Sequence, residues 1–162
     1  MSKRKYLFPR PYQADLMQTI VISGKDEIIA EIARYQSNIK KSWCACVDSW
    51  IPMFSMSEGV RQGYIAAKDR GIKIRYITEI TADNLVQCKQ IADFAELRHL
   101  PKITGSFSVS ETEFIAGLRR GGPIEKLVYS NVPEIVRHQQ EIFETCWNNA
   151  VSAESRIKEL ES

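Results

Sequence analysis

The chain has 162 residues, of which 44% are apolar and 26% are charged, and this size and composition are typical of one globular domain. Its 22 Lys and Arg residues nearly balance its 20 Asp and Glu residues, so the net charge of +2 creates no long-range field that would gather nucleic acid or anionic lipid. We therefore expect neither a nucleic-acid partner nor a membrane partner.

The sequence also lacks the segments that enter or cross membranes. No apolar run approaches the roughly 20 residues that span a bilayer, and the N-terminal region lacks the apolar core and cleavage pattern of a secretion signal. We expect a cytoplasmic protein.

The first half of the chain alternates short apolar runs with amphipathic segments. Residues 19–22 and 43–48 predict strands, and residues 25–40 predict a helix because apolar side chains recur at helical spacing. A second helix is expected over residues 57–70, where Gly71 is suited to end it. Such alternation favours a mainly parallel sheet covered by helices on both faces.

The next segments complete the predicted sheet. Residues 73–78 predict a third strand, and a helix is expected from Thr81 until just before Pro101. The runs FSVS and EFIAG then predict a hairpin, and residues 126–130 predict a last strand. We expect an α/β fold with a single mixed, mostly parallel sheet flanked by helices. We also interpret Arg119 and Arg120, in the Gly-rich loop before that last strand, as solvated charges.

The C-terminal region predicts one long helix that begins near Pro133 and continues to the end of the chain. Its apolar and small residues recur every three or four positions, which is the spacing of a coiled-coil seam. The seam comprises Val136, Gln139, Phe143, Cys146, Ala150, Ala153, Ile157 and Leu160. We expect an N-terminal extension over residues 1–18, an α/β body over 19–147, and a projecting helix over 148–162 that pairs with a second copy in a homodimer.

Four cysteines are present, and none is arranged as a zinc site or as a secreted disulfide framework. Cys44 and Cys46 share one face of a predicted strand, whereas Cys88 and Cys146 are single. We interpret all four as reduced packing residues, with a redox role as an unsupported alternative. We expect no metal and no cofactor.

The common catalytic motifs are absent. The sequence has no G-x-S-x-G, no phosphate-binding P-loop, no G-x-G-x-x-G and no H-E-x-x-H. Its two histidines, His99 and His138, are interpreted as structural or solvated.

Polar side chains at predicted strand ends are the remaining candidates for a binding site. Ligands of open α/β sheets bind beyond the carboxyl ends of parallel strands. Asp48 falls at such an end, and the candidate ligand-binding residues are Arg75, Thr78, Glu79, Arg98, Ser110, Glu111, Ser130 and Asn131. Arg75 and Glu79 are expected on one face of their strand. They form either a mutually satisfied buried pair or part of a pocket, in which Arg75 or Arg98 recognises an anionic group and Glu79 a donor.

Three stretches together resemble a known family. They read RGIKIRYITEIT, then AELRHLPKITGSFSVSETEFIAG, then VYSNVPEIVRHQQEIFETCWNNAVSAESRIKELE. Over residues 19–161 the succession resembles the N-terminal signal-input domain of archaeal sensory histidine kinases, which precedes PAS and kinase modules. That family resembles one half of the phospholipase D fold.

The resemblance implies a fold without the phospholipase D chemistry. Those enzymes use a histidine nucleophile in an H-x-K motif followed by an Asp, and the corresponding hairpin here, GSFSVSETEFIAG, has neither His nor Lys. The resemblance therefore implies that the old active-site crevice serves as a ligand pocket.

The leading hypothesis is a non-catalytic sensory input domain of a histidine kinase. It would respond to a small-molecule or protein signal and relay that state through its C-terminal helix to a downstream PAS or kinase module. One alternative is the sensor domain of a transcriptional regulator. Another is a small enzyme that acts on a phosphorylated substrate, with Glu79 or Glu111 as the base.

Overall fold

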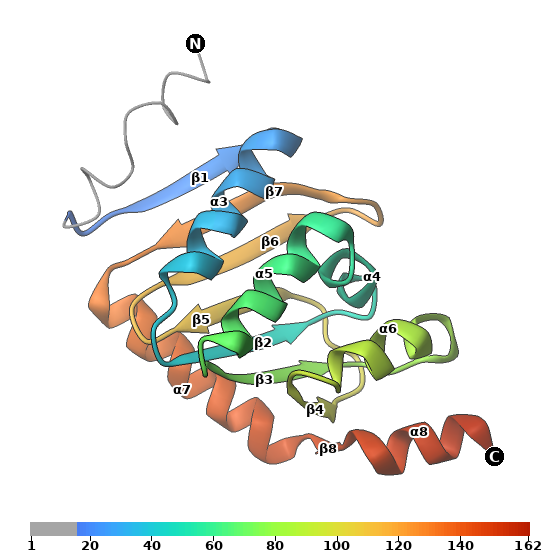
Figure 1. Ribbon diagram of the computed structural model, residues 1–162. Coiled ribbons are helices and arrows are strands. Elements are labelled where there is room, and N and C mark those ends of the chain that lie inside the picture. The colour runs from blue at the N-terminus through green and yellow to red at the C-terminus, as the bar shows by residue number, and fades with distance from the viewer. Residues whose placement is uncertain (1–15) are drawn as a thin grey trace.

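The structure is a computed structural model that describes residues 16–162, so nearly all of the predicted N-terminal extension lies outside the described residues. Eight strands form one sheet with helices on both faces (Figure 1). The strands are β1 (Thr19–Ser23), β2 (Ser42–Val47), β3 (Lys73–Thr78), β4 (Glu96–His99), β5 (Ser106–Ser110), β6 (Phe114–Arg119), β7 (Ile124–Ser130) and β8 (Val151–Ser152). The helices are α3 (Lys25–Asn38), α4 (Ile51–Ser55), α5 (Glu58–Asp69), η1 (Ala82–Asn84), α6 (Leu85–Ile91), α7 (Pro133–Asn149) and α8 (Ala153–Glu161).

The strand order across the sheet is β1-β7-β6-β5-β2-β3-β4-β8. Parallel pairing is limited to β2 with β3 and β3 with β4, and every other neighbouring pair is antiparallel. The short connections from β5 to β6 and from β6 to β7 account for two of the antiparallel pairs, because a tight turn joins antiparallel neighbours. The predicted single mixed sheet is confirmed, although less of it is parallel than expected.

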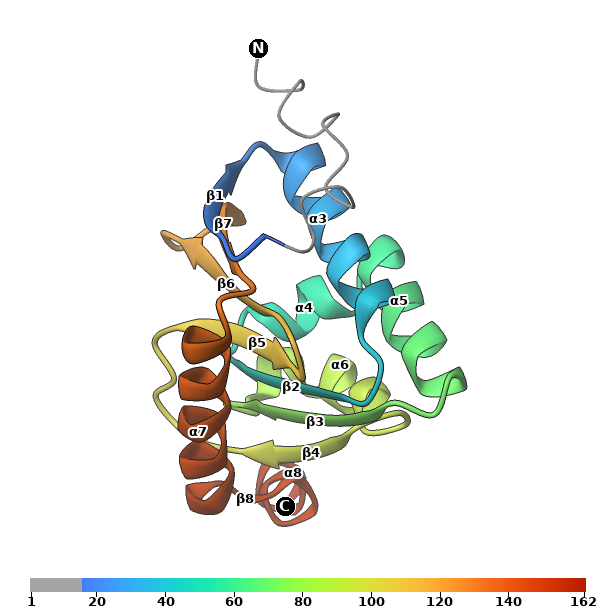
Figure 2. The ribbon, with the colours of Figure 1, turned by 90° about the vertical axis from the view of Figure 1, so that its left-hand side faces the viewer.

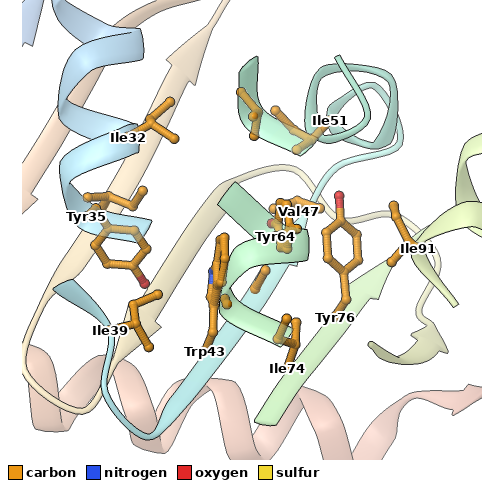
Figure 3. Packing of buried hydrophobic residues seen from close by; sticks show 14 of the residues in the cluster. Ile32, Tyr35, Ile39, Trp43, Val47, Ile51, Tyr64, Ile74, Tyr76 and Ile91 are labelled. Carbon is orange, nitrogen blue, oxygen red and sulfur yellow. The ribbon is translucent and has the colours of Figure 1, made fainter. Parts of the chain in front are cut away.

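The helices divide unequally between the two faces of the sheet. Figure 2 shows α3 and α5 on one side and α7 on the other. The larger core lies beneath α3 and α5, where Trp43 of β2 stacks on Tyr64 of α5 with ring centroids 3.9 Å apart (Figure 3). The smaller core lies beneath α7, where Phe143 and Trp147 pack on the central strands.

Residues 96–99 form strand β4 and not the end of a helix, so that prediction is wrong. Helix α6 ends at Ile91, and Leu97 and His99 are buried while Glu96 is exposed, which is the period-two burial of a strand. The Glu, Leu and Arg of this stretch favour a helix locally. Pairing with β3 overrides that preference.

The predicted continuous C-terminal helix is also wrong. It breaks at Ala150, whose backbone is extended (φ −82°, ψ 151°), and the next two residues pair with β4 as strand β8. Helix α8 starts anew with Ser152 as its N-cap, and the Ser152 hydroxyl accepts a hydrogen bond from the Ser155 amide.

Helix α8 then packs against the body instead of projecting from it (Figures 1 and 2). Ala153, Ile157 and Leu160 contact the larger core, and the Arg156 Nε donates a hydrogen bond to the Ile80 carbonyl at 3.0 Å. The predicted seam over residues 148–162 is therefore used within one copy. The expected homodimer stays a prediction, because the structure contains a single copy of the chain.

Candidate functional site

The hairpin formed by β5 and β6 is the segment in which a phospholipase D enzyme would carry its H-x-K motif. Two side chains that are two residues apart on a strand share one face, and in β5 the pair facing α3 and α5 is Ser106 and Ser108. The Ser108 hydroxyl accepts a hydrogen bond from Trp43 Nε1 at 2.7 Å and pairs with the Tyr35 hydroxyl at 2.9 Å. Both contacts are buried, so Ser108 holds aromatic side chains together.

Aromatic side chains fill most of the space above this hairpin. The remaining cavity has a volume of about 70 Å³ and lies among Tyr35, Trp43, Tyr64 and Ser108. Ligand pockets usually have about 300–1,000 Å³, so this cavity is much smaller than a ligand site. The prediction that the old crevice forms a ligand pocket is therefore not supported on this face of the sheet.

Larger hollows lie on the opposite face, on either side of α7. We call the first the carboxyl-edge groove, because it lies toward the edge at which β2, β3 and β4 end. Its volume is about 490 Å³, within the usual range of ligand sites. It is lined by Cys46, Leu100, Pro101, Lys102, Ile103, Thr104, Gly105, Ser106, Phe107, Phe114, Ala116, Gly117, Leu118, Gln139 and Cys146.

The floor and walls of the carboxyl-edge groove differ in chemistry. The floor consists of apolar side chains of β5 and β6, among them Phe107 and Ala116, and α7 forms one wall. The loop over residues 100–105 forms the other wall and contributes Lys102, whose φ of 60° lies in the left-handed region. The groove thus combines an apolar floor with a few polar groups around it.

An ion pair closes the sheet edge next to this groove. Asp48 follows β2, and its two carboxylate oxygens accept hydrogen bonds from Arg119 Nε and Nη2 at 3.0 and 2.9 Å. The Asp48 carboxylate also accepts from the Trp50 amide and the Ser106 hydroxyl. Partial burial raises the pKa of Asp48, but the hydrogen bonds from Arg119, Trp50 and Ser106 outweigh it, and the pKa is below its ordinary value.

Arg119 is therefore not the solvated charge that the sequence suggested. Its side chain is 18% exposed, and its guanidinium lies 4.8 Å from the centre of the Trp50 ring. No local pattern marks this residue, because its partner Asp48 is distant in the sequence.

Two of the predicted binding residues, Thr78 and Glu79, lie at this same edge. The buried Thr78 hydroxyl donates to the Asp48 carbonyl at 3.1 Å, and the Glu79 carboxylate accepts from the Lys102 amide at 3.4 Å. Nearby, His99 Nδ1 accepts a hydrogen bond from the Ile80 amide at 2.9 Å. Burial, followed by the charge of Arg156, lowers the pKa of His99, so this imidazole is a neutral acceptor.

Four other predicted residues lie at the opposite edge, where β2 and β3 begin, because β5 and β7 run antiparallel to β2 and β6. These residues are Ser110, Glu111, Ser130 and Asn131. Glu111 accepts hydrogen bonds from the backbone amides of Lys40, Lys41 and Ser42, whereas the Ser130 hydroxyl pairs with that of Thr19. These four residues therefore lie at a different edge of the sheet from Thr78 and Glu79.

The Glu111 carboxylate and the Asn131 side chain both hold backbone in place. Burial raises the pKa of Glu111, but the backbone hydrogen bonds from Lys40, Ser42 and Lys41 outweigh it and lower the pKa. Asn131 Oδ1 accepts from the Gln18 amide at 2.8 Å.

The side chains of Arg75 and Arg98 both contact residues of α7. Arg75 forms an ion pair with Glu144, and Arg98 lies 4.0 Å from the centre of the Trp147 ring while it donates to the Trp147 carbonyl. Because Glu79 accepts from Lys102, the alternative of an Arg75–Glu79 pair is also wrong.

A second, polar groove brings together three of the predicted residues. It has a volume of about 400 Å³ and lies on the amino-edge side of α7. Arg75, Ser110 and Glu111 line it, with Ser42, Cys44, Val109, Arg137, Gln140, Glu141 and Glu144. We call this the amino-edge groove. Whether any of the eight predicted residues binds a ligand stays a prediction.

Two features are absent from residues 16–162. Over this range no three His, Cys, Asp or Glu side chains are grouped so that they could hold a metal ion. In the same residues, no helix combines the length and the apolar character needed to span a bilayer.

Comparison with known proteins identifies the fold. No protein-family model matches this sequence, and no curated protein is significantly similar to it. Among solved structures, TrmBL2, an archaeal chromatin protein with a novel mode of DNA binding, superposes with a TM-score of 0.68 and 17% identity. The match covers 93% of this chain and 63% of TrmBL2, so this chain spans less than two thirds of that protein.

Two bacterial proteins match over nearly their whole length. Nuc from Salmonella typhimurium, a phospholipase D family member, has a TM-score of 0.68 and 14% identity, and the match covers 83% of this chain and 97% of Nuc. NucT from Helicobacter pylori has a TM-score of 0.70 and 10% identity over 84% of this chain and 99% of NucT.

The likeness to TrmBL2 contradicts the expectation that excluded nucleic acid, because a protein with this fold over almost the whole chain is described as DNA-binding. That expectation relied on net charge, which is a property of the whole chain and not of a surface. The sheet order, the helices on both faces and these superpositions lead to one conclusion: the chain has the phospholipase D-like fold.

Proposed function

We propose that this chain is a non-catalytic sensory domain that binds a small effector in the carboxyl-edge groove and controls an output module of a larger regulatory protein. The observation that carries this proposal is that serines, and not the His and Lys of an H-x-K motif, stand in the β5–β6 hairpin. Its inward-facing Ser106 and Ser108 hydroxyls are used in structural hydrogen bonds.

The positions of the two histidines support the absence of phospholipase D chemistry. That chemistry needs a histidine nucleophile in the hairpin. His99 lies on β4 and accepts from a backbone amide, and His138 lies on the exposed side of α7. Neither is in the hairpin.

The chemistry of the groove favours an effector with an apolar body and at least one acceptor or anionic group. Leu100, Phe107 and Ala116 offer apolar contact, while Lys102 and Gln139 offer donors around it. A sensory role also requires that the protein has two conformations that bind the effector with different affinity. The loop over residues 100–105 is suited to this change, because it is largely exposed and contains Lys102 in the left-handed conformation.

Two kinds of output have specific support. The likeness to TrmBL2 supports a DNA-associated regulator, in line with the transcriptional-regulator alternative. The sequence resemblance over residues 19–161 supports an input domain of a sensory histidine kinase as the second candidate. Sequence that neighbours this chain in its open reading frame separates the two, because a winged-helix or other DNA-binding segment favours the first and a kinase core favours the second.

The binding proposal is tested with a groove-filling variant. Ala116→Leu adds bulk to the floor of the groove, and Ala66→Leu makes the same change on the exposed side of α5 as a matched control. In a thermal-shift screen of metabolites, we expect at least one compound that raises the melting temperature of the wild type and of Ala66→Leu but not of Ala116→Leu. A hit that stabilises all three proteins equally would place the effector elsewhere.

The non-catalytic part has a separate test. The protein is incubated with bis(p-nitrophenyl) phosphate, a generic phosphodiester, and release of nitrophenolate is followed by absorbance. We expect no release above the buffer rate. Turnover that persists through purification and is lost in His99→Ala or His138→Ala would refute a purely sensory role.

A further inference from the structure

A pair of cysteine side chains meets across the interface between α7 and the sheet. Cys46 belongs to the central strand β2, and Cys146 belongs to α7, 100 residues later in the chain. Both side chains line the carboxyl-edge groove, and Cys146 packs against the small core that contains Cys46. The two side chains therefore share one groove and one core, between β2 and α7.

The two thiols differ in access to solvent. Cys46 is 4% exposed, whereas Cys146 is half-buried on the side of α7 that carries Gln139, another residue of the groove. A small molecule in the groove can therefore reach Cys146 first, with Cys46 directly behind it.

We propose that Cys46 and Cys146 form a reversible disulfide that links β2 to α7. The oxidant is a low-molecular-weight disulfide, RSSR. The Cys146 thiolate attacks one sulfur of RSSR, which gives a mixed disulfide on Cys146 and releases RS⁻. Cys46 then loses its proton to water and attacks the Cys146 sulfur, which forms the Cys46–Cys146 bond and releases the second RS⁻. In sum, two protein thiols and one RSSR become one protein disulfide and two RSH.

The order of these steps follows from the surroundings of each sulfur. Burial, followed by the neighbouring Cys146, raises the pKa of Cys46 to about 12, so this thiol is a poor first nucleophile. Its attack in the second step is intramolecular, which offsets the low thiolate fraction. Excess RSH reverses both steps.

The other two cysteines provide controls because each has a hydrogen-bond partner outside this pair. Cys44 lies on the same face of β2, but it lines the amino-edge groove and accepts a hydrogen bond from Arg75 Nη2 at 3.5 Å. Cys88 lies on the buried face of α6, and its thiol donates to Asn84 Oδ1 at 3.3 Å. The proposed bond is independent of the sensory function, although it would cross the floor of the proposed effector site.

The experiment uses the folded chain in glutathione buffers of increasing ratio of oxidised to reduced form. Samples are quenched with acid, alkylated with N-ethylmaleimide in denaturant, and analysed by intact mass and by peptide mapping. We expect the wild type to lose two of its alkylation sites and to yield one cross-linked peptide that joins Cys46 to Cys146. Cys44→Ser and Cys88→Ser should behave in the same way.

The single variants distinguish the two steps. Cys46→Ser should stop at a mixed disulfide between glutathione and Cys146, and Cys146→Ser should show no modification at Cys46. Circular dichroism of the oxidised wild type checks that the bond forms in the folded state, where we expect native ellipticity and a higher melting temperature.

Three results would overturn the proposal. One is full alkylation of all four cysteines in the most oxidising buffer, and another is a cross-link that joins a different pair or two chains. The third is a Cys46–Cys146 bond that appears only when urea has unfolded the protein.

Discussion

Replacement of Asp48 by Asn tests how the edge beside the carboxyl-edge groove is held. The Asp48 carboxylate accepts four hydrogen bonds, two from Arg119 and one each from the Trp50 amide and the Ser106 hydroxyl. An Asn side chain keeps one acceptor oxygen. Its amide group would face Arg119 Nε, donor against donor, and the Arg119 charge would lose its counter-charge.

The expected cost follows from burial and bond type. Hydrogen bonds to a charged group contribute about 1.5–3 kcal/mol each, and breaking a fully buried pair costs about 3–5 kcal/mol. The two side chains are 14% and 18% exposed, so water screens part of the orphaned charge. We expect Asp48→Asn to lower the free energy of unfolding by about 2–4 kcal/mol, which corresponds to roughly 5 to 15 °C in melting temperature for a domain of this size.

The same pair makes a prediction about acid. The pKa of Asp48 is lower in the folded protein than the ordinary value of about 3.9 in the unfolded chain. Its stabilisation is therefore present above about pH 4 and is lost as the pH falls through the folded pKa. The difference in stability between wild type and Asp48→Asn should be largest at neutral pH and should shrink below about pH 4.

Urea unfolding at pH 7 and pH 3 measures both effects, and a double-mutant cycle isolates the pair. Arg119→Met keeps most of the side-chain volume over Trp50 and removes the charge. We expect the double variant to be less destabilised than the sum of the single variants by about 1–2 kcal/mol. A coupling near zero, or a penalty for Asp48→Asn that is the same at both pH values, would refute the assigned role.

Three further predictions concern other parts of the fold. Glu113→Gln should lower the free energy of unfolding in urea by about 2–4 kcal/mol, because the buried Glu113 carboxylate accepts hydrogen bonds from Arg34, Asn38 and Tyr129. The same change at the exposed Glu125 should lower it by less than about 0.5 kcal/mol, and equal losses would contradict this. Ser152→Ala removes the N-cap of α8, so we expect a loss of about 1 kcal/mol and faster hydrogen exchange confined to α8, and unchanged exchange there would mean that the cap is not needed. Arg98→Met should loosen the contact with Trp147 and shift the tryptophan emission to longer wavelength, an idea that fails if the spectrum does not move.

Much of the local structure could be predicted from the sequence. The short apolar runs of β2 and β3 and the helical spacing of α3 identify those elements, and Gly71, at φ 85°, follows the end of α5 as expected. These signals are local, because each depends on burial of one face of one element.

Two errors arose where tertiary pairing opposed local preference. The ELRH stretch has helix-forming residues, yet it forms β4 because the edge of β3 offers it backbone hydrogen bonds. The C-terminal seam has helical spacing throughout, yet Val151 and Ser152 pair with β4 and break the helix. A serine cap at Ser152 was the local signal that could have located the break.

The sequence alone was enough to locate most of the strands and helices and to show that the hairpin contains no histidine. It also identified candidate polar residues, three of which line the amino-edge groove. Only the tertiary structure decided which strand ends lie together, that Asp48 pairs with Arg119, and that Cys46 and Cys146 line the same groove. Strand direction and helix docking are set by hydrogen bonds and burial between residues far apart in the chain, and no local pattern records those partners.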